Sequence, residues 1–545
     1  MPIHSQYPPI TVSPLDLWAF FFDNADREFP DDHVVYVDTA ANKRLAFRNI
    51  QATAEQFGQG LLANWGWQRG DILALITPNS VNVASVTCGA LYAGGVVCAL
   101  NHLSTAVELA QSLKASNAKA LVTNFECLEA VREAANIVGM SNDRILLIDE
   151  TDSKHEFQHF TSIRSSFPRL KRPEIKPERD LAFLVYSSGT TGLPKGVMLT
   201  HANITANLLQ TTETEGNFSH WTRDKSLGFL PMYHIYGMAV LVLSPLYRGV
   251  TTFIMQRFDL NNFCRIVQDD GITIAYIVPP VALALAKSPL VDNYNLESLR
   301  MLNSAAAPAP KEVIEGIYRR LGVPTKQAYG LTEASPAVAS QAAEEWNKPI
   351  GSSGRLTASM SMKVIQDGQE MGRGKTGEIW LRGPNIFKGY YNNPTATSDA
   401  IDAGGWYRTG DIGHVDENDN IFITDRLKEL IKYNGFQVPP AQLEALLLKH
   451  PAVADVAVIG IYAAARATEL PRAYIVLAGG LEGDEKMEQD LHEWFNKQVV
   501  PHKRLRGGIR FVMTIPKSNT GKILRRVLME EAKKEQEGTP VKALL

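Results

Sequence analysis

The sequence has few cysteines, little charge imbalance and no signal for secretion. Its four cysteines, in 545 residues, form no Cys-x-x-Cys pair and have no clustered histidines beside them. This spacing argues against a zinc site or a disulfide framework and favours a reducing compartment. The 55 basic and 58 acidic residues leave a net charge of -3, which argues against a general nucleic-acid surface.

One apolar run, residues 83–100, is long enough to cross a bilayer, but Gly94 and Gly95 divide it. We therefore predict a buried helix, a turn and a buried strand there, and no transmembrane segment. The N-terminus lacks the basic and apolar regions of a secretion signal, and the final Val-Lys-Ala-Leu-Leu is no clear peroxisomal address. We expect a cytoplasmic protein and leave a peroxisomal location open. Nothing in the sequence indicates the oligomeric state.

Strand-like and helix-like segments alternate along the chain. Residues 71–77, 119–124 and 144–149 are predicted strands, and residues 105–116 form a predicted amphipathic helix between them. This alternation predicts an α/β fold of parallel sheets covered by helices. The length exceeds what one hydrophobic core usually holds, so at least two domains are expected. We place a large N-terminal domain at residues 1–425 and a small, mobile α+β domain at residues 426–545.

The small domain is predicted from its own run of elements. A strand, a turn and a strand precede it at residues 404–424. Helices are expected at residues 440–450, 487–500 and 522–538, and strands at residues 453–461 and 472–477. The last helix is expected to stop at Gly538, a fitting C-cap, with Pro540 beyond it.

The segment at residues 186–196, Tyr-Ser-Ser-Gly-Thr-Thr-Gly-Leu-Pro-Lys-Gly, has the composition of a loop that binds phosphate. Its glycines let the backbone approach an anion, its hydroxyls can donate hydrogen bonds, and its lysine adds a positive charge. It is not a Walker A loop, because Pro194 replaces the second glycine and Gly196 replaces the hydroxyl residue. The candidate phosphate ligands are Ser187, Ser188, Gly189, Thr190, Thr191, Gly192 and Lys195.

Six further motifs follow in the sequence, at residues 231–238, 303–310, 329–333, 407–411, 425–430 and 516–526. They read PMYHIYGM, NSAAAPAP, YGLTE, YRTGD, DRLKEL and PKSNTGKILRR. Together with the phosphate loop, they resemble the signature motifs of the adenylate-forming superfamily. This superfamily includes acyl-CoA synthetases, luciferases and peptide-synthetase adenylation domains. The sequence as a whole is most similar to 4-coumarate–CoA ligases.

The resemblance implies an ATP-dependent acid–thiol ligase. A carboxylic acid would be converted to an acyl-AMP with release of pyrophosphate, and CoA would then accept the acyl group as a thioester. ATP, Mg²⁺ and CoA are the implied cofactors, and the expected acid is aryl or medium-chain aliphatic. Three alternatives stay open: transfer to a carrier protein or other acceptor, a nucleotide-hydrolysing switch, and a catalytically silent binding protein.

The resemblance also assigns residues to the chemistry. It implies that Lys522 reaches the acyl carboxylate and the α-phosphate, that Thr332 binds the α-phosphate, and that Glu333 holds Mg²⁺ through oxygen. His234 would be a gate between the acyl pocket and the thiol tunnel. Lys432 and Gln437 would contact the phosphate and serve the thioester step.

The remaining implied contacts are to the nucleotide and the thiol. The adenine would lie against Ala306, Ala307, Pro308, Tyr329 and Gly330. Asp411 and Arg426 would hold the ribose, Lys428 would be the hinge between domains, and Gly435 would face the thiol tunnel.

The acyl pocket is expected to contain Tyr236, Val240, Asn293, Ala305 and Ala328. Several of these positions carry extra methyl groups where relatives often have a glycine or a polar residue. We therefore expect a shorter and more apolar cavity. Each methylene in such a pocket changes the selectivity between acids by only about 1–3 kcal/mol.

Overall fold

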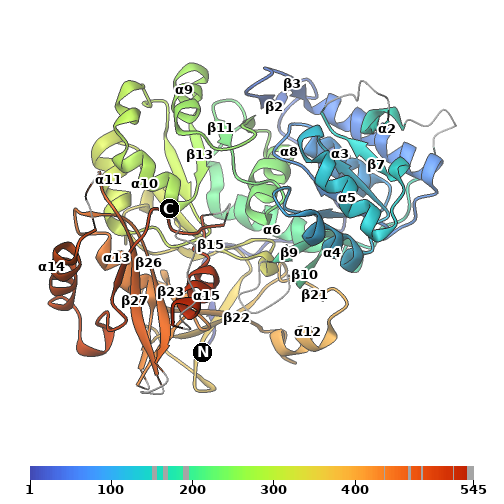
Figure 1. Ribbon diagram of the computed structural model, residues 1–545. Coiled ribbons are helices and arrows are strands. Elements are labelled where there is room, and N and C mark those ends of the chain that lie inside the picture. Colours follow the sequence, from blue (N-terminus) through green and yellow to red (C-terminus); the bar gives the residue numbers. More distant parts are fainter. Residues whose placement is uncertain are drawn as a thin grey trace.

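The computed structural model describes residues 1–149, 156–163, 170–187, 195–434, 436–463, 468–479, 481, 483–518 and 521–536. Its described residues form two large sheets covered by helices, a third sheet beside them, and a smaller C-terminal unit with sheets of its own (Figure 1). This arrangement confirms the predicted α/β fold.

The first large sheet has the strand order β21-β10-β9-β5-β4-β6-β7-β8. Its strands are β4 (Ile72–Ile76), β5 (Val96–Ala99), β6 (Ala120–Thr123), β7 (Ile145–Leu147), β8 (Gln158–His159), β9 (Leu181–Ser187), β10 (Lys195–Thr200) and β21 (Gly389–Tyr390). The helices that follow them include α3 (Val83–Tyr92), α4 (Ala106–Ser116) and α5 (Leu128–Val138). The apolar run at residues 83–100 thus forms a buried helix, a turn and a buried strand, as predicted.

The second large sheet has the order β17-β16-β15-β14-β13-β11-β12-β2-β3. Its strands are β2 (Val34–Asp38), β3 (Arg44–Ala46), β11 (Lys225–Gly228), β12 (Thr251–Ile254), β13 (Ile274–Ile277), β14 (Met301–Ser304), β15 (Thr325–Gly330), β16 (Ala337–Ser340) and β17 (Arg355–Leu356). Strands β2, β12, β11, β13, β14 and β15 are parallel neighbours, so their carboxyl ends meet at one edge. In open α/β sheets this edge is where ligands bind.

Helices α2 (Phe47–Trp65), α6 (His201–Glu215), α9 (Leu260–Asp270), α10 (Pro279–Lys287) and α11 (Lys311–Leu321) accompany these sheets. One continuous core joins the two, because side chains from both sheets and from α2, α3 and α6 pack into a single cluster. None of the helices in the described ranges is both long enough and apolar enough to cross a membrane.

A third, antiparallel sheet contains β1 (Ile3–His4), β18 (Ser361–Gln366), β19 (Gln369–Glu370), β20 (Gly377–Arg382), β22 (Tyr407–Val415) and β23 (Ile421–Arg426). Strands β22 and β23 are the predicted strand, turn and strand at residues 404–424. Their register pairs Asp411 directly with Arg426, which brings two predicted site residues together.

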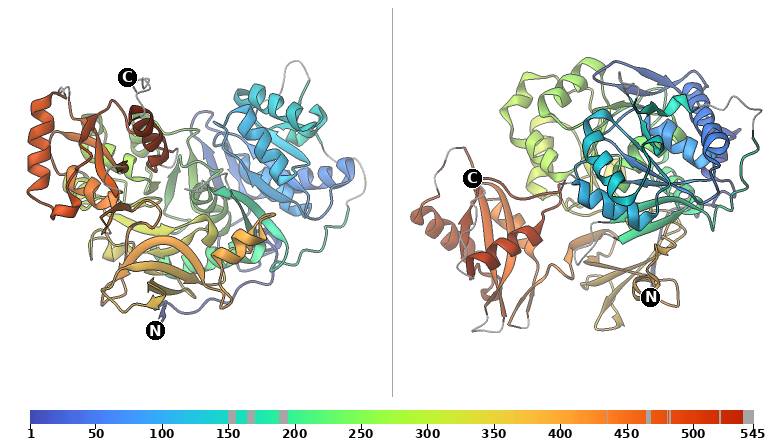
Figure 2. Two further views of the ribbon diagram at one scale, coloured as in Figure 1. Left: turned by 60° about the horizontal axis from the view of Figure 1, so that its bottom comes forward. Right: turned by 45° about the vertical axis from the view of Figure 1, so that its right-hand side comes forward.

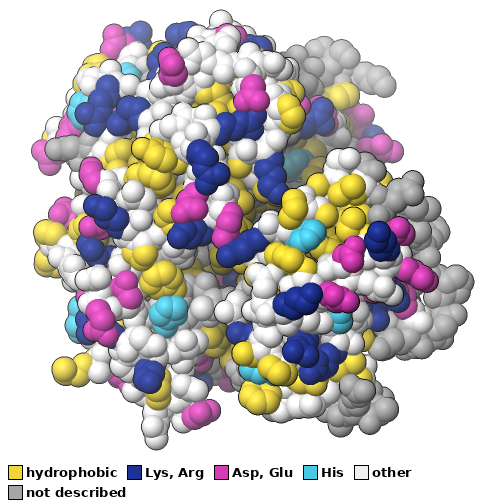
Figure 3. All heavy atoms as spheres, turned by 90° about the vertical axis from the view of Figure 1, so that its left-hand side faces the viewer, with side chains coloured by type: hydrophobic (Ala, Val, Ile, Leu, Met, Phe, Trp, Pro, Cys, Tyr) yellow, Lys and Arg dark blue, Asp and Glu magenta, His cyan; other side chains and the backbone are white. Residues whose placement is uncertain are grey.

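The chain after β23 forms a separate lobe with its own core (Figure 2). The lobe contains β24 (Ile431–Tyr433), β25 (Phe436–Val438), α13 (Pro440–Leu447), β26 (Val453–Ala463), β27 (Thr468–Leu477), α14 (Glu485–Asn496), β28 (Ile509–Phe511) and α15 (Arg525–Gln536). Basic and acidic side chains are interspersed over the face of the molecule that carries this lobe (Figure 3).

The last helix begins later than predicted. It starts at Arg525 rather than at Lys522, because Ile523 pairs with Lys517 in an antiparallel bridge instead of continuing a helix. Gly521 adopts a positive φ of 77°, which also breaks a helical path. The predicted stop at Gly538 lies outside the described residues.

Candidate active site

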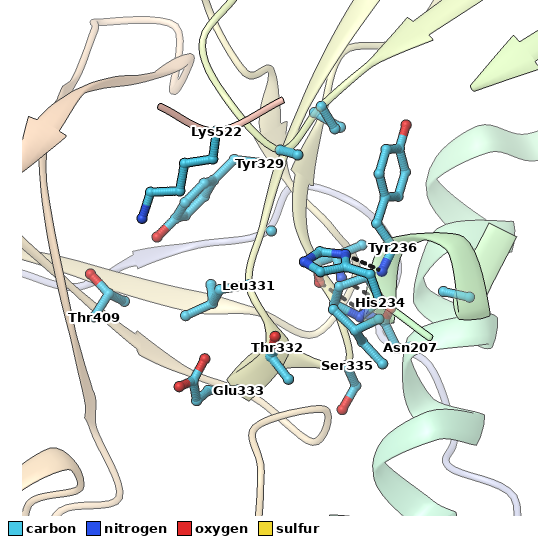
Figure 4. Close-up of a pocket in the computed structure, with 18 of the residues that line it drawn as sticks. Asn207, His234, Tyr236, Tyr329, Leu331, Thr332, Glu333, Ser335, Thr409 and Lys522 are labelled. Carbon is cyan, nitrogen blue, oxygen red and sulfur yellow. Dashed lines mark hydrogen bonds between the residues drawn. The ribbon is translucent and has the colours of Figure 1, made fainter. Parts of the chain in front are cut away.

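A cavity of about 1030 Å³ lies where the carboxyl ends of β14 and β15 meet α6, β22 and the loop before α15. Figure 4 shows Lys522 and Tyr329 on one side of it and His234, Tyr236 and Asn207 on the other. The cavity therefore joins residues that are more than four hundred positions apart in the sequence, from Ala99 to Leu524.

Asp411 is the centre of a hydrogen-bonded group at one end of the cavity. The Tyr329 hydroxyl donates to Asp411 Oδ2 over 2.6 Å, and Arg426 Nε lies 3.1 Å from Asp411 Oδ1. The Asp411 carboxylate is buried, and its negative charge raises the pKa of Arg426. This arrangement fixes an oriented carboxylate that can accept hydrogen bonds from a pair of sugar hydroxyls.

Glu333 and Thr332 lie on the short turn η7 (Thr332–Ala334), directly after β15, and both are buried against the cavity. The Tyr390 hydroxyl donates to Glu333 Oε1 over 3.0 Å, and burial raises the pKa of the Glu333 carboxyl. Lys195 Nζ lies 4.8 Å from the centre of the Tyr390 ring.

Within the described ranges, Glu333 has no basic residue in ion-pair contact, and no three His, Cys, Asp or Glu residues are grouped to hold a metal. A buried carboxylate without a cation is costly, so this oxygen ligand fits a divalent cation such as Mg²⁺. Magnesium usually takes one or two protein carboxylates and completes its coordination with phosphate and water.

Lys522 enters the cavity from the C-terminal lobe. Its Nζ lies 3.5 Å from Glu429 Oε1, and burial, followed by the nearby charge of Arg426, lowers its pKa. Arg525 holds the other carboxylate oxygen of Glu429 at 3.1 Å and both oxygens of Glu444 at 2.8 Å. The position of the Lys522 loop is thus supported by an ion-pair cluster within its own lobe.

His234 and Tyr236 line the cavity on the side opposite Lys522 and Tyr329 (Figure 4). The backbone N–H of Tyr236 donates to His234 Nδ1 over 3.2 Å, so this nitrogen is an acceptor and the imidazole is neutral. Burial lowers the pKa of His234 to about 4, in agreement with a neutral ring. The Tyr236 hydroxyl donates to the backbone oxygen of Asn303 over 3.1 Å, which fixes the Tyr236 ring.

The comparisons with known proteins agree with this geometry. The family model of the AMP-binding enzyme matches residues 22–391, and that of the AMP-binding enzyme C-terminal domain matches residues 442–522. The chain belongs to the AMP-binding enzyme family. The resemblance identified from the motifs is therefore confirmed.

Named relatives of this AMP-binding enzyme cover nearly its whole length. A 4-coumarate:CoA ligase 1 from Petunia hybrida is 37% identical over 524 residues, which is 94% of this chain and 93% of that protein. A 4-coumarate–CoA ligase from Pinus taeda is 36% identical over 534 residues and 96% of each chain. The crystal structure of ATP-bound MatB from Rhodopseudomonas palustris superposes with a TM-score of 0.83 at 26% identity, covering 95% of this chain and 99% of that one.

Most of the predicted nucleotide residues that the structure describes line the cavity of this AMP-binding enzyme. They are Lys195, Ala306, Tyr329, Gly330, Thr332, Glu333, Arg426, Lys428 and Lys522. Asp411 does not line the cavity itself, but it contacts Tyr329 and Arg426, which do. Ala307 and Pro308, which follow Ala306 in the sequence, do not line the cavity. Ser187 ends β9, and Ser188, Gly189, Thr190, Thr191 and Gly192 lie outside the described residues.

Lys432, one of the residues predicted for the thioester step, lies away from the cavity in this structure. Lys432 and Gln437 are cross-strand partners on the β24–β25 hairpin, and Lys432 is exposed. Lys432 does not line the cavity. Gly435, at the turn of this hairpin, lies outside the described residues.

The acyl part of the cavity differs from its prediction. Tyr236, Val240, Ala305 and Ala328 line it, but Asn293 is exposed at the end of the turn η6 (Pro289–Asn293) and lies outside the cavity. The expectation of a shorter and more apolar pocket stays a prediction. The deep end is lined by polar and charged side chains, which are Thr211, Thr214, Glu215, Ser244, Arg248, Tyr276, Ser340 and Thr357.

Sequence reasoning missed Tyr390 and Glu215. Tyr390 holds Glu333, but it is contributed by a two-residue edge strand that carries no periodic signal. Glu215 belongs to a visible pattern, because Ile204, Leu208, Thr211 and Glu215 recur at helical spacing on α6. That spacing could have predicted which face of α6 borders the site, although not what lies opposite.

Proposed function

We propose that this AMP-binding enzyme converts an aryl or medium-chain aliphatic carboxylic acid to an acyl-AMP, releasing pyrophosphate, and then to a CoA thioester. The observation that carries the proposal is the meeting of Lys522, from the C-terminal lobe, with Glu333 and the Tyr329–Asp411–Arg426 group in one cavity. The names of the relatives, which are CoA ligases, support the same reaction.

In the first step, the substrate carboxylate attacks the α-phosphorus of ATP and pyrophosphate leaves. No general base is needed, because the acid is already ionised at neutral pH. The Lys522 ammonium stabilises the charge that develops between the carboxylate and the α-phosphate, and Thr332 donates a hydrogen bond to the phosphate. Asp411 and Arg426 hold the ribose, so that the α-phosphate is presented to the acid.

Glu333 is the proposed Mg²⁺ ligand, and the bound cation would neutralise part of the phosphate charge. The phosphate loop at residues 187–195 is proposed to surround the phosphates released as pyrophosphate. Tyr390 keeps the Glu333 carboxylate in place through its hydroxyl.

In the second step, the thiol of CoA attacks the carbonyl of the acyl-AMP, and AMP leaves. We propose that the lobe at residues 426–545 rotates about Lys428 between the steps, which removes Lys522 and brings Lys432, Gly435 and Gln437 to the site. The exposed side chains of Lys432 and Phe436 on the β24–β25 hairpin support this proposal, because Lys432 does not line the cavity in the present orientation. A cytoplasmic location is also proposed, supported by four cysteines without a disulfide.

The test is mass spectrometry of a reaction that contains the protein, ATP, Mg²⁺, CoA and a panel of aryl and aliphatic acids. We expect an acyl-CoA together with AMP. Acyl-AMP without a thioester would indicate that the acceptor in the second step is a carrier protein or another molecule rather than CoA. ADP as the product would refute adenylate formation.

Lys522→Ala separates the two steps. The variant is expected to lose acyl-AMP formation and to retain thioester formation from a supplied acyl-AMP. The matched control is Lys534→Ala, in the last turn of α15, which should retain both steps. Equal loss of both steps in Lys522→Ala would contradict the assigned role.

A further inference from the structure

Glu429 is the carboxylate that lies beside the ammonium group of Lys522. Its Oε1 is 3.5 Å from Lys522 Nζ, and both side chains are largely buried. Among the residues that the structure describes, no other carboxylate lies within ion-pair distance of this ammonium group. The reaction proposed above uses Lys522, but it gives Glu429 no part.

The surroundings of Lys522 otherwise disfavour a positive charge. Three charged groups act on it, which are Arg426 on β23, Asp411 on β22 and Glu429 in the turn after β23, and the Tyr329 ring lies beside it (Figure 4). Burial lowers the pKa of Lys522, and Arg426 lowers it further. Asp411 raises this pKa, but it is already engaged by Tyr329 and Arg426. Glu429 also raises the pKa of Lys522 and is therefore the carboxylate that can serve it directly.

Glu429 is held at its backbone and at its side chain. Its backbone N–H donates to the backbone oxygen of Arg426 over 2.9 Å, in the turn that also carries Lys428. Its other carboxylate oxygen, Oε2, lies 3.1 Å from Nη1 of Arg525. Arg525 begins α15, three positions after Lys522, so one carboxylate connects the end of the Lys522 loop to the helix that follows.

Arg525 is in turn held by the body of the C-terminal lobe. Its Nη2 makes two hydrogen bonds of 2.8 Å to the carboxylate of Glu444 on α13, and its Nε donates to the backbone oxygen of Val458 over 3.3 Å. Glu444 also accepts a hydrogen bond of 2.8 Å from the backbone N–H of Val458. These contacts fix the plane of the guanidinium and hence the direction in which it presents Nη1 to Glu429.

We propose that Glu429 is a positioning residue for acyl-AMP formation, which holds the Lys522 ammonium in the cavity until the α-phosphate of ATP replaces it as the partner. A strong charge-assisted hydrogen bond is about 2.7–2.9 Å long, so a contact of 3.5 Å is loose enough for the ammonium to move to a nearer phosphate oxygen. This inference rests on the proposed function, because it concerns the lysine that the same reaction uses.

Glu429→Gln keeps the size of the side chain and removes its charge. We expect kcat/KM for ATP to fall about tenfold in the acid-dependent exchange of pyrophosphate into ATP, on the scale of a lost hydrogen bond to a charged group. The alkaline limb of this pH profile should also move to lower pH, because burial and Arg426 then lower the pKa of Lys522 with less opposition. Thioester formation from a supplied acyl-AMP should keep the wild-type rate.

Glu444→Gln is the matched control. It removes a carboxylate charge from the same ion-pair cluster, but Glu444 pairs with Arg525 rather than with Lys522. This variant should lose thermal stability and leave the alkaline limb at its wild-type position. Glu429→Asp restores the charge on a shorter side chain and should return the limb towards its wild-type position.

A second measurement does not depend on activity. Fluorodinitrobenzene reacts only with an unprotonated amine, so labelling at a series of pH values, followed by mass spectrometry of the peptide that contains Lys522, reports the titration of this side chain. Labelling of Lys522 should begin at a lower pH in Glu429→Gln than in the wild-type enzyme. The curve of Glu444→Gln should coincide with that of the wild type.

An alkaline limb and a labelling curve that do not move in Glu429→Gln would overturn the inference. An equal shift in Glu444→Gln, or an equal loss of thioester formation in Glu429→Gln, would overturn it as well, because Glu429 would then act only through the stability of the lobe. Each of these results leaves the proposed function intact, since the wild-type enzyme still forms acyl-AMP. No AMP release by the wild-type enzyme with any acid would instead overturn the proposed function, and the role of Glu429 in it, even if the labelling curve shifts.

Discussion

Replacing Gly521 with alanine should weaken the docking of the C-terminal lobe on the rest of the enzyme. Gly521 precedes Lys522 in the loop that reaches the cavity, and it lies directly against Pro280 at the start of α10. A Cβ atom at this position would be 2.8 Å from both Cγ and Cδ of Pro280 and 3.6 Å from Cγ2 of Val278. The proline ring is rigid, so the loop itself has to move, and Lys522 moves with it.

An alanine at position 521 destabilises the enzyme in two separate ways, through its backbone conformation and through its contact with Pro280. The positive φ of 77° at Gly521 costs an alanine roughly 1–2 kcal/mol wherever the lobe is placed. The clash with Pro280 is added only when the lobe is docked. If it destabilises the docked position by about 1.4–2.8 kcal/mol, acyl-AMP formation slows by about tenfold to hundredfold.

Gly508→Ala is the matched control. Gly508 lies in the same lobe, has a φ of 85°, and a Cβ there has only Glu488 Oε1 within 4 Å, at 3.8 Å. Both variants should lose similar thermal stability. Only Gly521→Ala should slow the acid-dependent exchange of pyrophosphate into ATP, while thioester formation from a supplied acyl-AMP stays near the wild-type rate.

Pro280→Ala in the Gly521→Ala background removes the ring atoms of the clash and should recover part of the exchange rate. Equal exchange rates in Gly521→Ala and Gly508→Ala would refute the reasoning, because the backbone cost alone would then explain the loss.

Three further predictions concern the nucleotide end of the site. Tyr329→Phe removes a hydrogen bond of 2.6 Å to the Asp411 carboxylate and should raise KM for ATP about tenfold with a small change in kcat, as steady-state kinetics would measure. Glu333→Gln keeps the size of the side chain but removes its charge, so a Mg²⁺ titration should show much weaker activation and acyl-AMP formation reduced by about a hundredfold. Burial and Arg426 lower the pKa of Lys522, so its ammonium loses its proton at a lower pH than an ordinary lysine. Acyl-AMP formation should therefore fall as the pH rises through this lowered pKa, whereas thioester formation from supplied acyl-AMP should not follow the same curve; parallel curves would contradict the role of Lys522.

The parts of the fold that the sequence predicted are those with a strong local signal. Strands β4, β6 and β7 are short apolar runs, and α4 has a complete amphipathic period with a threonine N-cap. The break at Gly94 and Gly95 correctly separated α3 from β5. These choices depend on residues within a few positions of one another, so no tertiary information was needed.

The remaining features depend on contacts between distant segments. Residues 522–524 were assigned to a helix, but the bridge between Lys517 and Ile523 overrides their helix propensity. Asn293 was placed in the acyl pocket by position in a motif, whereas its turn faces solvent. The ion pairs of Glu215 with Arg248 and Lys326 could not be predicted, because these three residues come from three elements that only the folded sheets bring together.

The pairing of Asp411 with Arg426 also has a consequence for the timing of the reaction. Strand β23 ends at Arg426, and Lys428, the proposed pivot, follows two residues later and borders the same cavity. The ribose site and the pivot are therefore carried by one continuous stretch of backbone. By thermodynamic reciprocity, a nucleotide that favours one orientation of the lobe is held more tightly in that orientation. If the lobe rotates as proposed, the conversion of ATP to acyl-AMP and the later departure of AMP would each change the preferred orientation of the lobe, through the strand that ends at Arg426.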